Sequence, residues 1–169
     1  MDAGILFYLA HRTSACQRTI ARACGFFGVD AGCISVCARP QNLNGCLSNL
    51  LKDKTIVFAV GASEEKRPDC AAPIFRTLRV PLDRLGEPKG IMKLRGAEQT
   101  GYLVESVNQA IVILPDDPYE ILQMLPGMFD RLKAKFSLEG EFPKEDRPDY
   151  EKLAQCLRDQ APPVSAAEK

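Results

Sequence analysis

Three short polar segments contain the side chains best suited to bind a charged ligand, and each follows an apolar run. The first, His11–Ser14, offers a guanidinium, two hydroxyls and the free N–H groups of a helix start, which together suit a phosphate or a carboxylate. This interpretation makes Arg12, Thr13 and Ser14 candidate ligand-binding residues. An ordinary helix start with a solvated arginine explains the same residues equally well.

The second segment, Gly61–Asp69, combines small residues with a cluster of charges. Gly61, Ala62 and Ser63 open the segment as candidate ligand-binding residues. The two glutamates that follow would repel a phosphate unless neighbouring cations or a divalent ion neutralised them. A solvated charged loop explains the segment as well, and it is the favoured interpretation.

The third segment contains the acid pair Asp116–Asp117 between two prolines. A carboxylate and water could hold Mg²⁺ here, because that ion needs only one or two protein oxygens. The same residues are good helix N-cap and first-turn acids, and their positions favour this capping role over metal binding.

Several functional classes are excluded by the composition. His11 is the only histidine and faces no recognisable nucleophile elbow, and neither a dinucleotide-binding glycine pattern nor a phosphate-binding Gly-Lys-Ser/Thr loop occurs. The formal net charge is zero, so we expect neither nucleic acid nor a membrane surface as partner. Seven scattered cysteines, an odd number, indicate reduced thiols in a cytoplasmic protein: Cys16, Cys24, Cys33, Cys37, Cys46, Cys70 and Cys156.

The elements that would position these segments alternate between apolar runs and helical stripes. We expect strands at 4–9, 29–37, 55–60, 101–106 and 110–114, and helices near 14–27, 43–51, 69–79, 118–135 and 148–159. The segment 81–99 has no persistent period and is predicted to be a long loop with one helical turn at most. Pro126 and the following glycine are expected to kink or split the fourth helix.

This order predicts an α/β fold of three layers, with a mostly parallel sheet and one antiparallel strand contributed by the hairpin around Asn108. We expect one domain over residues 1–140. A linker, a short helix and a disordered tail would follow over 141–169. In such a sheet the three polar segments follow strands at their carboxyl ends and should form one cleft.

The run from Gly101 to Glu120 resembles the closing segment of the molybdopterin-binding fold, which is shared by molybdenum-cofactor biosynthesis proteins and the N-terminal domain of competence-damage-inducible proteins. Leu114–Pro118 stands where that family has Leu-Pro-Gly-x-Pro, with Asp116 in place of the glycine. Gly61–Asp69 is similar to the family's glycine-rich loop, with Ala62 in place of its second glycine. The order of elements over 4–136 is similar as well.

The resemblance implies a pterin or nucleotide as ligand, together with Mg²⁺ and a homo-oligomeric assembly. It makes Asp69 the candidate catalytic acid and a candidate metal ligand, and Gly61 a ligand-binding residue. Asp116 of the acid pair is the second candidate metal ligand and a candidate ligand-binding residue, and Ala62 and Ser63 are further candidate ligand-binding residues. Arg12, Thr13 and Ser14 belong to its least similar segment.

Two functions remain open at this point. The first is a divergent domain that binds an anionic small molecule, in molybdenum-cofactor or nucleotide metabolism. The second is a homo-oligomeric or partner-binding module that has lost the ligand chemistry, which the replaced glycines favour. Whether the protein is an enzyme is left undecided, and any adenylyl transfer or hydrolysis is expected to be weak.

Overall fold

A computed structural model describes residues 1–144 of the 169-residue chain. The predicted helix over 148–159, the tail beyond it and Cys156 lie outside the described residues. Aromatic contacts of Phe142 lie just beyond the predicted boundary at residue 140. Phe142 stacks edge-on against Phe27, with ring centroids 4.9 Å apart, so packing continues past that boundary.

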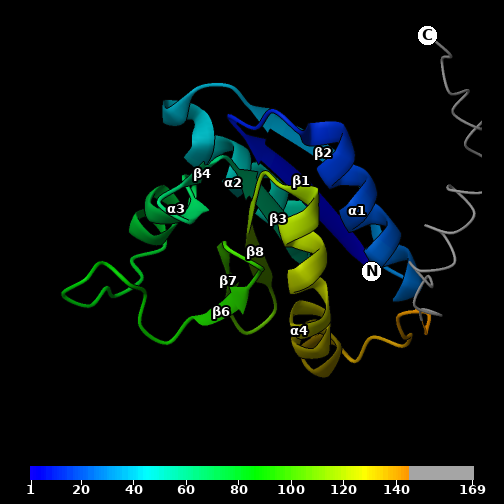
Figure 1. The fold of residues 1–169 in the computed structure, drawn as a ribbon. Helices are drawn as coiled ribbons and strands as arrows, with labels where there is room; N and C mark the ends of the chain where they lie inside the picture. The colour runs from blue at the N-terminus through cyan, green and yellow to red at the C-terminus, as the bar shows by residue number, and fades with distance from the viewer. Residues whose placement is uncertain (145–169) are drawn as a thin grey trace, which may run out of the picture.

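A six-stranded sheet forms the middle layer, in the order β2-β1-β3-β8-β7-β6 (Figure 1). Its strands are β1 (Asp2–Tyr8), β2 (Asp30–Cys37), β3 (Ile56–Gly61), β6 (Met92–Arg95), β7 (Thr100–Glu105) and β8 (Ala110–Pro115). The pairings β2-β1, β1-β3 and β3-β8 are parallel, whereas β7 pairs antiparallel with both β8 and β6. Only β7 therefore runs against the other strands, and the predicted fold class is confirmed.

Helices cover both faces of the sheet, as Figure 1 shows. The helices are α1 (Thr13–Phe26), α2 (Leu43–Asp53), α3 (Ala71–Thr77) and α4 (Pro118–Phe136). Alternate residues of the central strands point to opposite faces. Ile5 and Phe58 pack with α1 and α4, whereas Leu6 and Val57 pack with α2 and α3. β3 and β8 are apolar and buried along their whole length because both of their faces are covered.

The ends of the long helices follow local sequence signals in part. Gly28 has a φ of +66° just after α1, and the N–H of Val29 donates to the carbonyl of Cys24, which is the usual glycine-terminated helix end. Asp117 caps α4, as favoured above. Pro126 lies inside α4, which continues from Pro118 to Phe136, so of the two predicted outcomes, a kink or a split, the split does not occur.

The segment 81–99 is more regular than predicted. It contains the edge strand β6, in which only Leu94 is buried, and a bridge between Leu82 and Pro88. The bridge closes an excursion of the chain over residues 82–88. Within this excursion the carboxylate of Asp83 accepts the N–H groups of Leu85 and Glu87, at 2.8 and 2.9 Å. No helical turn forms between α3 and β6, a stretch that the structure describes in full. A four-residue edge strand with one buried side chain leaves too little pattern in the sequence to be recognised.

A second small hairpin lies in the charged loop after β3. Its strands are β4 (Ser63–Glu64) and β5 (Arg67–Pro68), and its turn residues Glu65 and Lys66 have φ values of +50° and +67°. Such turns usually contain asparagine or glycine, so two charged residues here gave no turn signal.

All cysteines within residues 1–144 are free thiols, as expected. None of the described helices has the length and apolar character needed to cross a membrane.

Candidate functional site at the carboxyl edge of the sheet

The register of the sheet brings the three polar segments to one edge. Tyr8, the last residue of β1, pairs with Gly61, the last residue of β3, which in turn pairs with Pro115 at the end of β8. The loops that follow these strands therefore begin side by side. A further backbone hydrogen bond, 2.8 Å long, joins the N–H of Asp116 to the carbonyl of Gly61.

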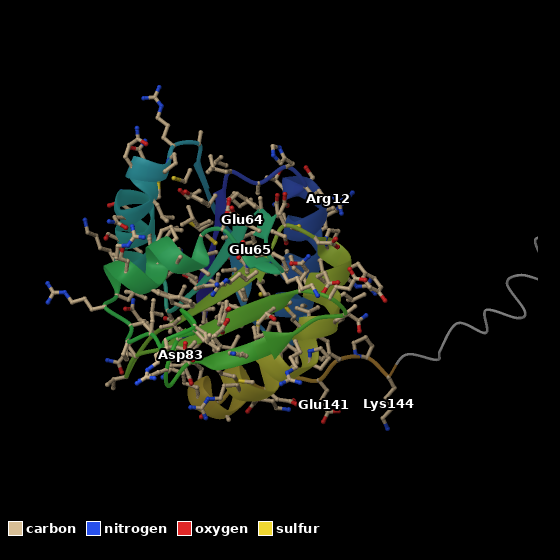
Figure 2. All side chains as sticks on the ribbon, turned by 60° about the vertical axis from the view of Figure 1, so that its left-hand side comes forward. Arg12, Glu64, Glu65, Asp83, Glu141 and Lys144 are labelled. Carbon is tan, nitrogen blue, oxygen red and sulfur yellow. The ribbon has the colours of Figure 1, made fainter. Side chains whose placement is uncertain are left out.

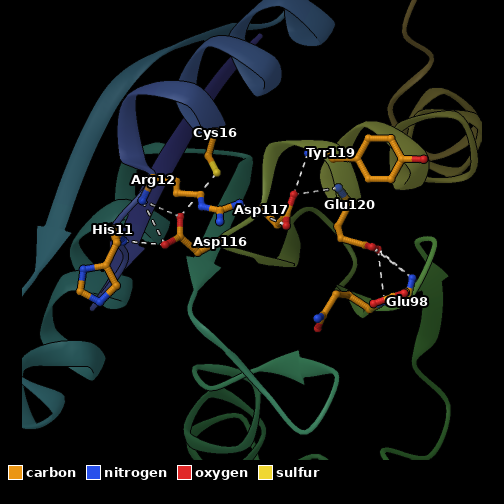
Figure 3. Close-up of polar contacts among 9 residues, drawn as sticks. His11, Arg12, Cys16, Glu98, Asp116, Asp117, Tyr119 and Glu120 are labelled. Carbon is orange, nitrogen blue, oxygen red and sulfur yellow. Dashed lines mark hydrogen bonds and ion pairs between the residues drawn. The ribbon is translucent and has the colours of Figure 1, made fainter.

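Asp116 connects the third loop to the first (Figure 3). Its carboxylate accepts the backbone N–H of His11 at 2.5 Å and that of Arg12 at 3.1 Å, and the thiol of Cys16 lies 3.5 Å away. These amides belong to the start of α1, where an external anion was predicted to bind. The chain's own carboxylate occupies that place. Together with burial, its charge raises the pKa of the Cys16 thiol to about 12.

Asp117 makes a different set of contacts in the same loop. Its carboxylate accepts the N–H groups of Tyr119 and Glu120, at 2.9 and 3.3 Å, and so caps α4 (Figure 3). It also lies 3.3 Å from the guanidinium of Arg12, which remains 62% exposed. Arg12, the cationic candidate ligand-binding residue of the first loop, thus lies beside the third loop, and its guanidinium remains accessible to solvent.

Asp69, the last residue of the segment after β3, packs against Gly61. A Cβ added to Gly61 would collide with Asp69 Oδ1 and would lie 2.7 Å from Cys70 Sγ, so only glycine fits there. Oδ1 of Asp69 is inaccessible to solvent and has no hydrogen-bond partner among the described residues. Burial, with smaller contributions from the charges of Glu64 and Asp116, raises the pKa of Asp69 to about 6.

The glutamates of the β4–β5 hairpin are exposed, as Figure 2 shows for Glu64 and Glu65 at the same end of the molecule as Arg12. Ser63 is exposed on this hairpin, and Ala62 is partly buried, its carbonyl accepting the N–H of Asp69 at 2.8 Å. In the first loop Thr13 is partly buried and Ser14 is exposed. Neither residue caps α1 with its side chain.

The structure therefore joins some of the predicted site residues more tightly than others. Contacts connect Arg12 to Asp116, Asp116 to Gly61, and Gly61 to Asp69. Thr13, Ser14 and Ser63 lie on the same loops, but no side-chain hydrogen bond to this group is present within the described part of the chain. The roles of all these residues in binding or catalysis remain predictions.

Beside the site is a second carboxylate that accepts backbone N–H groups of another loop, and sequence reasoning missed it. Glu120 is 6% exposed, and its carboxylate accepts the N–H groups of Glu98 and Gln99 at about 3.1 Å each (Figure 3). A Cβ on Gly96 would collide with Oε2 of Glu120, so a glycine is needed for the turn to close over the carboxylate. The acid at the start of α4 thus holds the turn between β6 and β7, and the only sequence signal was Gly96 itself.

The donor set fits a divalent cation better than it fits a free phosphate. Asp69 has an unpartnered oxygen beside other carboxylates, an arrangement that a cation would relieve. The amides of the first loop are already satisfied by Asp116. No group of three or more histidine, cysteine, aspartate or glutamate side chains placed for metal binding occurs within residues 1–144, so water or ligand oxygens would have to complete the coordination of Mg²⁺.

Comparison with known proteins gives a likeness of fold. No protein-family model matches the sequence, and no curated protein matches it significantly. Among solved structures, a CinA protein of unknown function from Thermoplasma acidophilum has a TM-score of 0.57 at 11% identity, over 79% of this chain and 96% of that one. The chain has the molybdopterin-binding fold.

Two further structures with this molybdopterin-binding fold support the assignment. A putative molybdenum cofactor biosynthesis protein from Corynebacterium diphtheriae has a TM-score of 0.57 at 12% identity, over 81% of this chain and 96% of that one. The molybdopterin biosynthesis enzyme MoaB from Thermus thermophilus has a TM-score of 0.55 at 14% identity, over 83% of this chain and 99% of that one. The expected fold is confirmed.

Proposed function

We propose that this molybdopterin-binding-fold domain binds a phosphate-bearing small molecule, a pterin or a nucleotide, at the carboxyl edge of the sheet, with Mg²⁺ between the ligand and Asp69. One observation carries the proposal. Oδ1 of Asp69 is buried without a hydrogen-bond partner in the described residues, at the edge where open α/β sheets bind ligands. Leaving a buried carboxylate oxygen unpaired costs free energy that a cation would return.

Charges around Asp69 support a cation rather than a bare anion. Burial is the main cause of the raised pKa of Asp69, and the charges of Glu64 and Asp116 raise it further, so an anionic ligand would meet repulsion unless a metal ion came with it. The guanidinium of Arg12 is exposed at the same edge and could bind a second charged oxygen of the ligand. Asp69 would hold the metal, and Arg12 would orient the anionic group outside the amides that Asp116 occupies.

Turnover is expected to be weak in this arrangement. Stabilisation of developing phosphate charge depends on backbone amides aimed at the reacting group, and losing one such donor typically costs about a hundred- to a thousandfold in rate. Here the amides of His11 and Arg12 already bind Asp116. We therefore propose a binding function first. A Mg²⁺-ATP assay of the unmodified chain and of the double variant Ala62→Gly, Glu64→Gly compares the two for residual adenylyl transfer or hydrolysis.

Calorimetric titration of the full-length chain with ATP, GTP and molybdopterin, with and without Mg²⁺, tests the proposal. Mg²⁺ should raise the affinity for at least one of these ligands, and Asp69→Asn should remove that gain. Asp130→Asn is the matched control, because Asp130 is exposed on α4 and makes no hydrogen bond or ion pair within the described residues. Identical binding with and without Mg²⁺, or equal effects of the two variants, would refute the role of Asp69.

The second candidate is a homo-oligomeric or partner-binding module without ligand chemistry. It is favoured by the contact of Asp116 with the amides of the first loop, and by the edge strand β2. Ile34 and Val36 on this strand are 41% and 66% exposed, and β2 has a strand partner on one side only within residues 1–144. Unprotected apolar edges of this kind favour strand pairing between chains.

Light scattering coupled to size-exclusion chromatography separates the two candidates. Pairing through β2 predicts an assembly in the unmodified chain that Val36→Lys dissociates, with no change in Mg²⁺-dependent binding. A monomeric chain, or an assembly that Val36→Lys leaves intact, would dismiss β2 as the interface.

A further inference from the structure

A cavity of about 350 Å³ opens at the opposite end of the sheet from the loop edge. It is lined by residues at the start of β8, the end of β7 and the segment that follows α3, including Val80, Ile91, Val104 and Ile111. Because the cavity is at the amino end of β8 and Asp116 follows its carboxyl end, about 17 Å of strand separates the two places. The cavity is therefore distinct from the candidate site.

The lining of this cavity is apolar with a cationic rim. Arg79 and Lys89 both line it, both are exposed, and neither forms an ion pair with another residue in the part of the chain that the structure describes. Glu105 also contributes to the lining, but its carboxylate lies 2.9 Å from Arg131 and 3.9 Å from Lys135 of α4. With two cations and one carboxylate among its charged residues, the lining carries a net positive charge.

Arg79 is held in an unusual backbone conformation. Its φ is +54°, in the left-handed region that glycine normally fills at the end of a helix. Its N–H donates to the carbonyl of Arg76 and the N–H of Val80 donates to that of Phe75, which is the hydrogen-bond pattern of such a helix end. An arginine at this position is strained in a way that glycine would not be, and it brings a guanidinium to the cavity. Backbone outliers of this kind cluster at ligand sites.

The segment between α3 and β6 forms one wall of the cavity and is held in place by its own contacts. Lys89 donates its N–H to the carbonyl of Pro81 at 2.8 Å, which closes the excursion at its base. Glu87 lies 2.8 Å from Lys93 of β6 and 3.5 Å from Arg67 of β5, so the excursion is tied to two strands. These contacts hold this wall of the cavity in place.

We propose that this cavity binds an amphipathic organic anion, with its apolar body against Val80, Ile91 and Val104 and its carboxylate or sulfonate between Arg79 and Lys89. The volume lies within the range of about 300–1,000 Å³ that small-molecule sites usually have. Apolar walls with few directed polar groups suit an aliphatic or aromatic body, and the two cations select the sign of its head group. This site is independent of the function proposed above.

The test uses the full-length ¹⁵N-labelled chain, titrated with octanoate and followed by amide chemical shifts. Octylammonium and 1-octanol serve as probes with the same apolar body and a positive or a neutral head. Octanoate should bind most tightly, and its shifts should concentrate at the amides of Val80, Ile91 and Gln109. Equal affinity for the three probes, or shifts spread over the whole surface, would overturn the proposal.

The substitution Arg79→Gly separates a loss of ligand binding from damage to the fold, because the two would change Tm in opposite directions. It removes one cation and relieves the positive φ, so octanoate affinity should fall about three- to fivefold while Tm rises by about 2–4 °C. Affinity for 1-octanol should not change. Arg84→Gly is the control, because Arg84 is exposed in the same excursion and does not line the cavity. Unchanged octanoate affinity in Arg79→Gly, or an equal loss in Arg84→Gly, would refute the assignment of the head group.

Discussion

Asp69 and Asp116 lie at the same edge of the sheet and differ in what surrounds their oxygens. Asp116 accepts two backbone N–H groups from a loop more than 100 residues earlier in the chain. Asp69 packs against a glycine, keeps one oxygen without a partner in the described residues, and has a raised pKa. The same residue type at the same edge thus binds distant backbone amides in one case and keeps one oxygen without a described partner in the other. The difference arises because the amides of the first loop reach Asp116 and do not reach Oδ1 of Asp69.

The largest effect should come from Gly61→Ala, which disturbs the Asp69 side of the comparison. The added Cβ would collide with the Asp69 carboxylate and with Cys70 at a fully buried strand end, so the free energy of unfolding should fall by about 2 kcal/mol. Urea denaturation measures it. Gly45→Ala is the control, since nothing lies within 4 Å of a Cβ there and a helical glycine is replaced, so its stability should rise slightly. Equal effects of both substitutions would show that Asp69 is not packed against Gly61.

Asp116→Ala should have the next largest effect. It leaves the N–H groups of His11 and Arg12 without their charged acceptor, and water can replace it only in part, so we expect a loss of about 1.5 kcal/mol in the free energy of unfolding. Amide hydrogen exchange at His11 and Arg12 should speed up at the same time. Exchange rates equal to those of the unmodified chain would contradict the contact between the two loops.

The raised pKa of Asp69 should make the stability of the chain depend on pH. Since the folded-state pKa of Asp69, about 6, lies above the value near 3.9 of an unfolded aspartate, the folded chain retains a proton between these values that the unfolded chain releases. Ionisation of Asp69 should thus lower stability as pH rises from about 4 to 6.5. Because the residue is only partly buried, we expect about 1 kcal/mol.

Asp69→Asn should flatten this dependence, and thermal melts between pH 4 and pH 8 measure it. Saturating Mg²⁺ should flatten it in the unmodified chain as well, if the cation binds the free oxygen. A stability that rises over this pH range because of Asp69 would reverse the sign of the argument.

The smallest effect is expected for Arg12→Gln. Its ion pair with Asp117 is 3.3 Å long but the guanidinium is 62% exposed, so the loss should stay below about 0.5 kcal/mol. If the proposed function is correct, ligand affinity should fall more than stability does. A loss of stability as large as that of Asp116→Ala would place Arg12 among the residues that hold the loops together.

The parts of the molecule that the sequence could predict are those with a local cause. Buried strands such as Ile56–Gly61 and the stripe of α4 follow from hydrophobic period, and the capping role of Asp117 follows from its position before Pro118. The contact between Asp116 and the first loop has no local signal, because its partners are about 100 residues away. The turn at Glu65 and Lys66 was missed because charged residues occupy positions where glycine or asparagine is usual.

The place of β8 in the sheet has a consequence for how the chain is made. β3 pairs with β8 through Ile56 and Ala110, so 54 residues of synthesis separate the two strands. At about 5 to 20 residues per second, the apolar edge of β3 waits roughly 3 to 11 s on the ribosome for its partner. Any sheet that β1, β2 and β3 build before β8 is made would have an open edge at β3, where a chaperone could bind or two nascent chains could pair wrongly.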